Sequence, residues 1–281
     1  MTAHTIPLQV QQLSVGLPHS ATPCTLLHDL SFDVQAGEIL GVVGESGSGK
    51  TTLGLACLGL LPPVFHTTGR VLLAGRNFSA LPEKGRYRLR GHGIGYVPQE
   101  PMKALNPGMT VGAHIAETLP TGLDKKERLE SVDYWLAQVG LMGGASMRQA
   151  YSFALSGGQR QRVLLAAALA GEPTVLIADE FTTALDPATR RNVVLLLKKQ
   201  AQKRNMAVVL ISHDLELVAH NTDTVLVLRG GQCVEYGPTQ TVLARPTSSY
   251  LQALLALSLQ FTPRPPLSLF EPEAIRSAQY D

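Results

Sequence analysis

The clearest chemistry in the sequence belongs to a glycine-rich segment that follows an apolar run. The apolar run spans 39–43, and the segment after it contains Gly44, Glu45, Ser46, Gly47, Ser48, Gly49, Lys50, Thr51 and Thr52. This spacing fits the phosphate-loop pattern G-x-x-x-x-G-K-[ST], whose glycines let successive backbone N–H groups point at phosphate oxygens. The lysine of such a loop reaches the β- and γ-phosphates, and the next hydroxyl takes a Mg²⁺ ligand position. Because a buried strand precedes it, we interpret the segment as a nucleoside triphosphate site rather than a flexible turn.

A pair of carboxylates ends a second apolar run. Residues 175–178 are all apolar and lead directly into Asp179 and Glu180, which is typical of a buried parallel strand that stops at a charged site. A carboxylate in such a place needs a positive partner or a metal ion. We therefore predict that Asp179 anchors Mg²⁺, in preference to forming a structural ion pair.

A third apolar run, residues 208–211, ends at Ser212, His213 and Asp214. Ligands of open α/β sheets lie beyond the carboxyl ends of the parallel strands. Lys50, the carboxylate pair and His213 each follow such a strand. We expect all of them to converge on one edge of one sheet, and that edge is the predicted site.

A second candidate anion site precedes the carboxylates in the chain. Ser156, Gly157, Gly158 and Gln159 stand before an apolar helix expected at 163–170. Serine is a favoured helix cap, and the glycines leave the first N–H groups of the helix open to an anion. The four residues alone would also suit a linker. Their position just before the 175–180 strand favours a functional role.

The remaining pattern predicts an α/β fold with a mixed sheet. Alternating apolar residues indicate strands at 8–16, 27–34 and 71–73, a short strand at 94–97 leads to Gln99, and 225–235 indicate a hairpin. Helices are expected at 111–119, 125–139 and, as a short pair, within 239–258. We predict one domain over 1–260 around a phosphate-loop core. It carries an antiparallel β subdomain, a helical subdomain over about 100–158 and a proline-rich, loosely ordered tail over 261–281.

Composition limits the class of protein without deciding it. The net charge is +2, with 44% hydrophobic and 16% charged residues, as in ordinary globular proteins. No apolar run approaches the ~20 residues that cross a bilayer, and we expect no secretory signal. The three separated cysteines give no zinc or iron–sulfur pattern and fit a reducing cytoplasm, with Cys57 expected in the core. The basic groups at 86–90 and 198–204 are interpreted as solvated helix faces, not as a nucleic-acid surface.

Taken in order, the motifs resemble the ATPase subunits of ABC transporters. The resemblance covers about residues 5–258 and rests on the phosphate loop, Gln99, the L-S-G-G-Q segment 155–159, the carboxylate pair, Ala184-Leu185-Asp186 and His213. A narrower resemblance, to importers of peptides and nickel, rests on 44–50, 98–102, 105–107 and 249–255. The run 88–91 is more similar to the first of the two paralogous ATPases of such a system than to the second.

The resemblance implies ATP as the nucleotide, Mg²⁺ as the metal ion and a head-to-tail pair with a second homologous ATPase subunit. ATP then lies between the phosphate loop of one subunit and the L-S-G-G-Q segment of the other, and Asp186 crosses the interface. Glu180 is the implied general base, His213 contacts the γ-phosphate, and Gln99 contacts Mg²⁺ and water. The implied partners are two transmembrane permease subunits and an extracytoplasmic substrate-binding protein. The chain is expected on the cytoplasmic face of the inner membrane, as a peripheral subunit without a nucleic-acid partner.

Two positions depart from the family pattern. Leu17 stands where many relatives place an aromatic ring against adenine, so base recognition is expected to be looser or to come from elsewhere. Phe181 replaces the proline that usually follows the catalytic glutamate, which could shift the loop 181–186.

Two other functions of an ABC ATPase agree less well with the sequence than an importer does. A soluble ABC ATPase acting on ribosomes or DNA usually joins two ATPase domains or carries coiled coils, and the sequence has neither a repeated motif set nor a heptad run. Against an export ATPase stand the segments 105–107 and 249–255. The cargo stays open among a peptide, a nickel ion and a metal chelate, and the segment 65–69 is mildly nickel-like.

Overall fold

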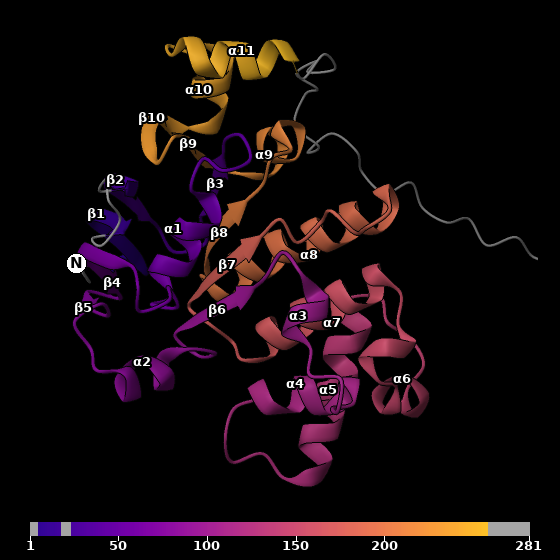
Figure 1. Cartoon of the computed structure of the whole chain (residues 1–281). Coiled ribbons are helices and arrows are strands. Elements are labelled where there is room, and N and C mark those ends of the chain that lie inside the picture. Colours follow the sequence, from indigo (N-terminus) through magenta and orange to yellow (C-terminus); the bar gives the residue numbers. More distant parts are fainter. Residues whose placement is uncertain (1–4, 18–23, 258–281) are drawn as a thin grey trace, which may run out of the picture.

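The computed structural model describes residues 5–17 and 24–257, and its larger sheet carries the predicted buried strands (Figure 1). This sheet has six strands in the order β10-β9-β3-β8-β7-β6. Neighbours pair in parallel except β9 and β10, which form an antiparallel hairpin. The predicted mixed sheet is therefore confirmed. The strand bounds are Ile39–Val43 (β3), Ile94–Val97 (β6), Val175–Asp179 (β7), Ala207–Ile211 (β8), Thr224–Arg229 (β9) and Gln232–Pro238 (β10).

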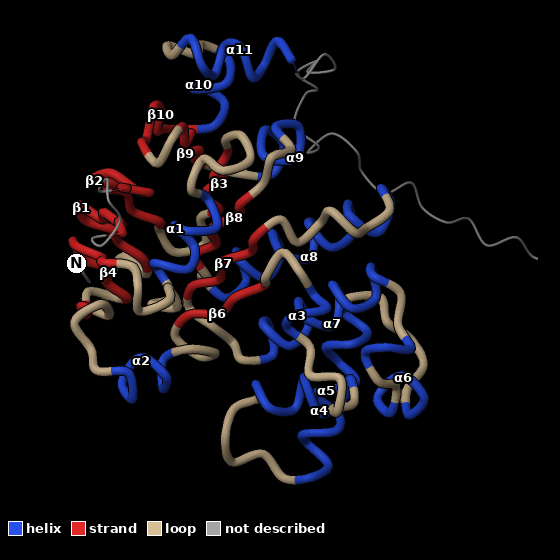
Figure 2. The backbone as a smooth tube through the Cα atoms, in the orientation of Figure 1, coloured by secondary structure: helices blue, strands red, loops and turns tan. Residues whose placement is uncertain are grey.

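A smaller antiparallel sheet lies beside the larger one (Figure 2). Its order is β2-β1-β4-β5, with bounds Leu8–Leu17 (β1), Cys24–Val34 (β2), His66–Leu73 (β4) and Arg76–Asn77 (β5). Helix α1, Lys50–Cys57, contacts β2 of this sheet and β7 and β8 of the other. Its apolar side chains share one hydrophobic cluster with both sheets. Cys57 is buried there, as predicted, and burial raises the pKa of its thiol to about 12.

Helices α3 to α7 gather at one end of the larger sheet, apart from the antiparallel sheet (Figure 1). Helix α7 is their centre, because it contacts α3, α4, α5 and strand β6. Apolar residues spaced by three and four, Val132, Trp135, Leu136 and Val139, give α5 its buried face. The bounds are Pro101–Ala104 (α3), Val111–Thr118 (α4), Lys125–Gln138 (α5), Ala145–Gln149 (α6) and Gly157–Ala170 (α7), with a 3₁₀ turn at Ser152–Ala154.

The remaining helices flank the sheets. They are Glu83–Leu89 (α2), Pro187–Arg204 (α8), Leu215–Asn221 (α9), Thr239–Ala244 (α10) and Ser249–Leu257 (α11). The last two confirm the pair of short helices expected there. The predicted tail at 261–281 lies outside the described residues. Among the residues that the structure does describe, no helix combines the length and the apolar character that a membrane span requires.

The prediction that the two basic groups are solvated helix faces is wrong for several of their members. The Arg90 guanidinium donates to the carbonyls of Leu58 and Gly59 at 3.0 and 2.9 Å. Lys198 donates to the His220 carbonyl at 2.8 Å, and the Arg204 guanidinium lies 5.1 Å from the centre of the Trp135 ring. These cations close helix ends and join α8 to α5. Sequence alone does not reveal such partners, because they come from distant elements.

Phe181 is a core residue in this fold. It exposes 1% of its surface and belongs to the same hydrophobic cluster as Ala178, Leu185 and Val193. The aromatic ring therefore fixes the segment after Glu180 from inside the protein, where proline would supply much less apolar area.

Replacing Phe181 with alanine should lower the free energy of unfolding by about 3–5 kcal/mol, because it leaves a cavity in a closed core. Urea unfolding followed by circular dichroism measures the change. The matched control is Phe153→Ala, since Phe153 is 69% exposed and should cost less than ~1 kcal/mol. Equal losses for the two variants would contradict the packing role assigned to Phe181.

Candidate functional site

Four parallel strands end at one edge of the larger sheet. In the register, Ile211 of β8 is paired with Val42 of β3 on one side and with Asp179 of β7 on the other. Val97 of β6 is paired with Ala178. The phosphate loop, the carboxylate pair, His213 and Gln99 all follow these ends directly, so the expected convergence on one edge is confirmed.

The phosphate loop has a backbone that only glycine can form at two of its positions. A Cβ on Gly44 would lie 2.2 Å from the Leu228 carbonyl oxygen, and Gly49 has a φ of 103° with a Cβ position 2.7 Å from Leu27 Cδ2. The loop closes on its own lysine. Lys50 Nζ donates to the carbonyls of Gly44 and Glu45 at 2.7 and 2.8 Å. Burial lowers the pKa of the Lys50 ammonium, while the carboxylates of Glu180 and Asp179 act in the opposite direction.

The loop retains unused polar capacity that suits phosphate. The Ser48 hydroxyl is buried and has no hydrogen-bond partner in the described structure. A Cβ on Gly47 would meet no atom within 4 Å, so the space beside this part of the loop is open. Helix α1 begins within the loop, at Lys50, and the first N–H groups of a helix lack acceptors within the helix. These features fit a bound polyphosphate.

One carboxylate oxygen of Asp179 also lacks a hydrogen-bond partner in the described structure. Its carboxyl group is fully buried, and Oδ1 has no hydrogen-bond partner in the described structure. The Thr51 side chain hydrogen-bonds the carboxyl, and the Tyr96 hydroxyl lies 3.5 Å from Oδ2. Burial raises the pKa of Asp179, and the hydrogen bond from Thr51 acts against that shift. A buried carboxylate oxygen beside a threonine hydroxyl fits the ligand chemistry of Mg²⁺.

Glu180 brings the three predicted catalytic residues together. Gln99 Nε2 donates to Glu180 Oε2 at 2.9 Å, and His213 Nδ1 lies 3.3 Å from Glu180 Oε1. The backbone of Glu180 has a φ of 42°, a left-handed conformation that costs energy for a residue with a side chain. Its N–H donates to the Ile211 carbonyl at 2.9 Å, which holds the strained turn against β8.

The second candidate anion site lies elsewhere on the chain. Ser156 caps α7 as predicted: its hydroxyl accepts from the Gln159 N–H, and the Gln159 side chain accepts from the Ser156 N–H. Within residues 5–17 and 24–257, none of the hydrogen bonds or ion pairs joins 156–159 to the phosphate loop. Asp186 caps α8 by accepting from the Thr189 N–H at 3.0 Å. The structure of one chain thus leaves Ser156, Gly157, Gly158, Gln159 and Asp186 outside the cluster around Glu180.

Sequence reasoning missed two residues that support the site. Tyr96 lies beside Asp179, and its place on the strand before Gln99 was the available signal. Gln161 exposes 1% of its surface and donates to the Pro98 carbonyl at 3.3 Å, so it ties α7 to the loop that carries Gln99. A glutamine in a helix start gives no sequence signal for burial.

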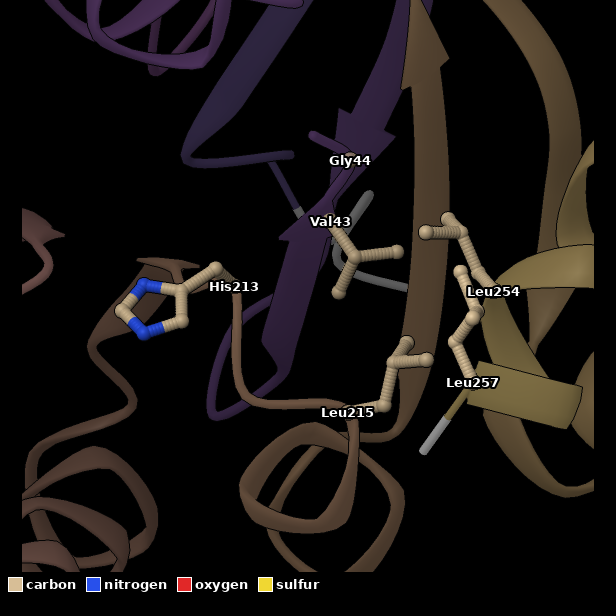
Figure 3. Close-up of a pocket in the computed structure, with 6 residues that line it drawn as sticks. All are labelled: Val43, Gly44, His213, Leu215, Leu254 and Leu257. Atoms are coloured by element: carbon tan, nitrogen blue, oxygen red, sulfur yellow. The ribbon is translucent and has the colours of Figure 1, made fainter. Parts of the chain in front are cut away.

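A pocket of about 250 Å³ opens next to the phosphate loop. Figure 3 shows His213 on one side and two leucines of α11 on the other, with the end of β3 between them. The lining residues are Val43, Gly44, His213, Leu215, Leu254 and Leu257.

Comparison with known proteins agrees with this geometry. The family model described as ABC transporter matches residues 27–183. The dipeptide transport ATP-binding protein DppD of Escherichia coli is 40% identical over 261 residues, which covers 90% of this chain and 79% of that protein. The oligopeptide transport ATP-binding protein OppD of Salmonella typhimurium is 38% identical over 250 residues, with 88% and 75% covered. The dimeric post-hydrolysis structure of the ATP-binding cassette MJ0796 has a TM-score of 0.75 at 24% identity and covers 83% of this chain and 99% of that one.

The chain belongs to the ABC transporter family. It is an ABC ATPase, an enzyme that hydrolyses ATP to power transport. The two sheets and the helices around α7 are the ABC ATPase fold.

The unpaired carboxylate oxygen of Asp179 leads to a prediction about the stability of this ABC ATPase. Asp179→Asn should raise the free energy of unfolding of the nucleotide-free and metal-free protein by about 1 kcal/mol, because it removes a buried charge that lacks one partner. Urea unfolding in the presence of a chelator measures it. Glu117→Gln, on an exposed carboxylate of α4, is the control and should change little. A clear loss of stability in Asp179→Asn would contradict the view that Asp179 destabilises the ligand-free protein and is there to bind a ligand.

Proposed function

We propose that this chain is the ATPase subunit of a membrane importer for peptides and that Glu180 is its general base. The observation that carries the catalytic assignment is the position of Glu180, whose two carboxylate oxygens face Gln99 and His213 at the edge where the phosphate loop also begins. The peptide cargo is supported by the names of the relatives, which are dipeptide and oligopeptide transport ATP-binding proteins.

In the proposed reaction, the residues of the phosphate loop bind the polyphosphate of ATP. The Lys50 ammonium now shared by two backbone carbonyls would exchange a carbonyl for a phosphate oxygen. The Ser48 hydroxyl, which is buried and unpaired in the described structure, would gain its hydrogen-bond partner at the same time. The same predicted binding segment also contains Gly44, Glu45, Ser46, Gly47, Gly49, Thr51 and Thr52.

Glu180 then accepts a proton from the attacking water or orients it. The Gln99 amide and the His213 ring hold the carboxylate from both sides, which fixes its direction before the substrate arrives. His213 contacts the γ-phosphate in this proposal, and its contact with Glu180 lets it respond when that phosphate leaves. Removal of a well-placed general base typically costs 10²–10⁴-fold in rate.

Thr51, Asp179 and Gln99 are the proposed protein ligands of Mg²⁺. When bound, the ion supplies neutralisation of the charge that develops on the phosphate oxygens. Asp179 offers its unpaired Oδ1, and the hydrogen bond between Thr51 and Asp179 already places two of the three groups together.

The second anion site is proposed to act on ATP bound by another ATPase subunit, in a head-to-tail dimer. The location of 156–159 away from the Glu180 cluster supports this, since no contact in the described part of the chain joins the two sites. Asp186 is proposed to lie at the same interface. Two permease subunits and an extracytoplasmic binding protein complete the proposed importer, with the ATPase on the cytoplasmic face of the inner membrane. A nickel or metal-chelate cargo gains no support from the names of the relatives reported above.

Two substitutions separate ATP binding from hydrolysis. Glu180→Gln should keep ATP affinity within about twofold but slow hydrolysis at least ~100-fold, whereas Lys50→Ala should weaken ATP binding itself. Equilibrium binding and phosphate release measure the two effects. Glu100→Gln, an exposed carboxylate in the loop after Gln99, is the matched control. Hydrolysis by Glu180→Gln at the parental rate would show that Glu180 is not the base.

The importer assignment is tested on native membranes. Affinity purification of the tagged chain after gentle solubilisation should recover two multi-span permeases and a second ATPase, and cells lacking this chain should lose uptake of a labelled dipeptide. Recovery of soluble partners alone, such as ribosomes, together with unchanged peptide uptake would overturn the proposed transport role.

A further inference from the structure

The C-terminal helix α11 reaches back to the phosphate loop. The N–H of Glu45 donates to the Tyr250 hydroxyl at 2.9 Å, although the two residues are 205 positions apart in the sequence. Tyr250 exposes only 7% of its surface and lies in the hydrophobic cluster that also holds Val43, the last residue of β3. A side chain from the end of the described chain therefore contacts the backbone of the nucleotide loop directly.

The Tyr250 ring is held by its surroundings in the core. The Arg229 guanidinium lies 5.1 Å from the centre of its ring, a cation–π distance. Farther along the same helix, Leu254 and Leu257 line the pocket beside Val43 and Gly44 (Figure 3). Packing thus limits the freedom of the ring, and the hydroxyl has a fixed position relative to β3.

The Glu45 residue is fixed on both of its backbone polar groups. Its N–H is bound by Tyr250, and its carbonyl accepts from Lys50 Nζ at 2.8 Å and from the Ser48 N–H at 3.2 Å. Removal of the tyrosine hydroxyl would break the one of these three Glu45 contacts that comes from outside the loop. The N–H groups that follow Glu45 would then be held less firmly.

A second contact from the same part of the chain fixes the far end of the loop. In the turn between β9 and β10, the Gly231 N–H donates to the Ser48 carbonyl at 2.9 Å. Two elements after residue 224 therefore hold the loop, one at Glu45 and one at Ser48. Arg229 connects these two elements, because it is the last residue of β9 before the turn and its guanidinium packs on the Tyr250 ring.

We infer that Tyr250 is a positioning residue for ATP: its hydroxyl holds the entry of the phosphate loop in the shape that binds the nucleotide. The inference rests on the proposed ATP site at this loop. It assigns to the C-terminal helix a direct effect on nucleotide affinity. Because a loop already held in its binding shape loses less entropy when the ligand arrives, the hydroxyl contributes to affinity without touching ATP.

Tyr250→Phe tests this with the full chain, since it removes one oxygen and keeps the ring. The dissociation constant and the KM for ATP should rise about three- to tenfold, the range expected for one hydrogen bond, while kcat at saturating ATP stays within about twofold. The control is Tyr236→Phe, whose hydroxyl donates to the Asp33 carbonyl at 3.1 Å in another part of the molecule. This control should leave KM unchanged.

Hydrogen exchange distinguishes positioning from a general loss of stability. In Tyr250→Phe without nucleotide, peptides that contain Glu45 should exchange faster, with protection elsewhere unchanged and the melting temperature close to the parental value. An unchanged KM in Tyr250→Phe, or faster exchange spread over the whole chain, would overturn the inference. If the parental protein itself fails to bind ATP, the proposed function is wrong and the inference falls with it, so the two failures are distinguishable.

Discussion

Parallel pairing of β6, β7, β8 and β3 is the constraint on which the site depends. Every residue of β3, β7 and β8 is buried, so both faces of these strands are covered and the pairing register is fixed by packing as well as by backbone hydrogen bonds. Since the strands run in the same direction, their carboxyl ends meet at one edge. The polar residues can appear only where a strand stops, and this explains why Asp179 closes β7 and Gln99 and His213 follow β6 and β8 within two residues.

The same edge concentrates features that work against stability. Lys50 and Asp179 are charged groups in buried positions, the Ser48 hydroxyl and Asp179 Oδ1 lack partners in the described structure, and Glu180 adopts a left-handed backbone. Most other buried positions of the described structure hold apolar side chains, although Gln161 and Gln200 also keep an unpaired oxygen. The two unpaired oxygens at this edge fit a site that a ligand completes, because each would gain a partner when polyphosphate and a metal ion bind. These unpaired groups lower the stability of the ligand-free protein, and their pairing with the ligand would contribute to binding affinity.

The sequence predicts the elements whose signal is local. Apolar runs predict β3, β7 and β8, and the glycine spacing predicts the loop between β3 and α1. Ser156 predicts the cap of α7. The structure confirms all of these elements. The contacts of Tyr250, Gln161 and Arg90 could not be predicted in this way, because each depends on which distant backbone group the fold brings within reach. Phe181 is similar: its type departs from the family pattern, and only the packed core explains why a large ring is accommodated. The roles of the site residues stay predictions, since they concern bound states.

Glu180 connects two loops that belong to different parts of the fold. Gln99 follows β6, which packs against α7, and Gln161 of α7 in turn holds the Pro98 carbonyl beside Gln99. His213 follows β8 in the middle of the sheet. A displacement of α7 relative to the sheet must therefore either carry Gln99 along and break its bond to Glu180, or break the bond of Gln161. In the first case, the carboxylate loses its support from Gln99 and keeps its contact with His213. In the second case, Gln99 keeps its bond to Glu180 but its loop is released from α7. In the proposed reaction, the position of the helices around α7 would decide whether the Glu180 carboxylate is aligned with the attacking water. A partner bound to those helices could therefore control hydrolysis by moving them.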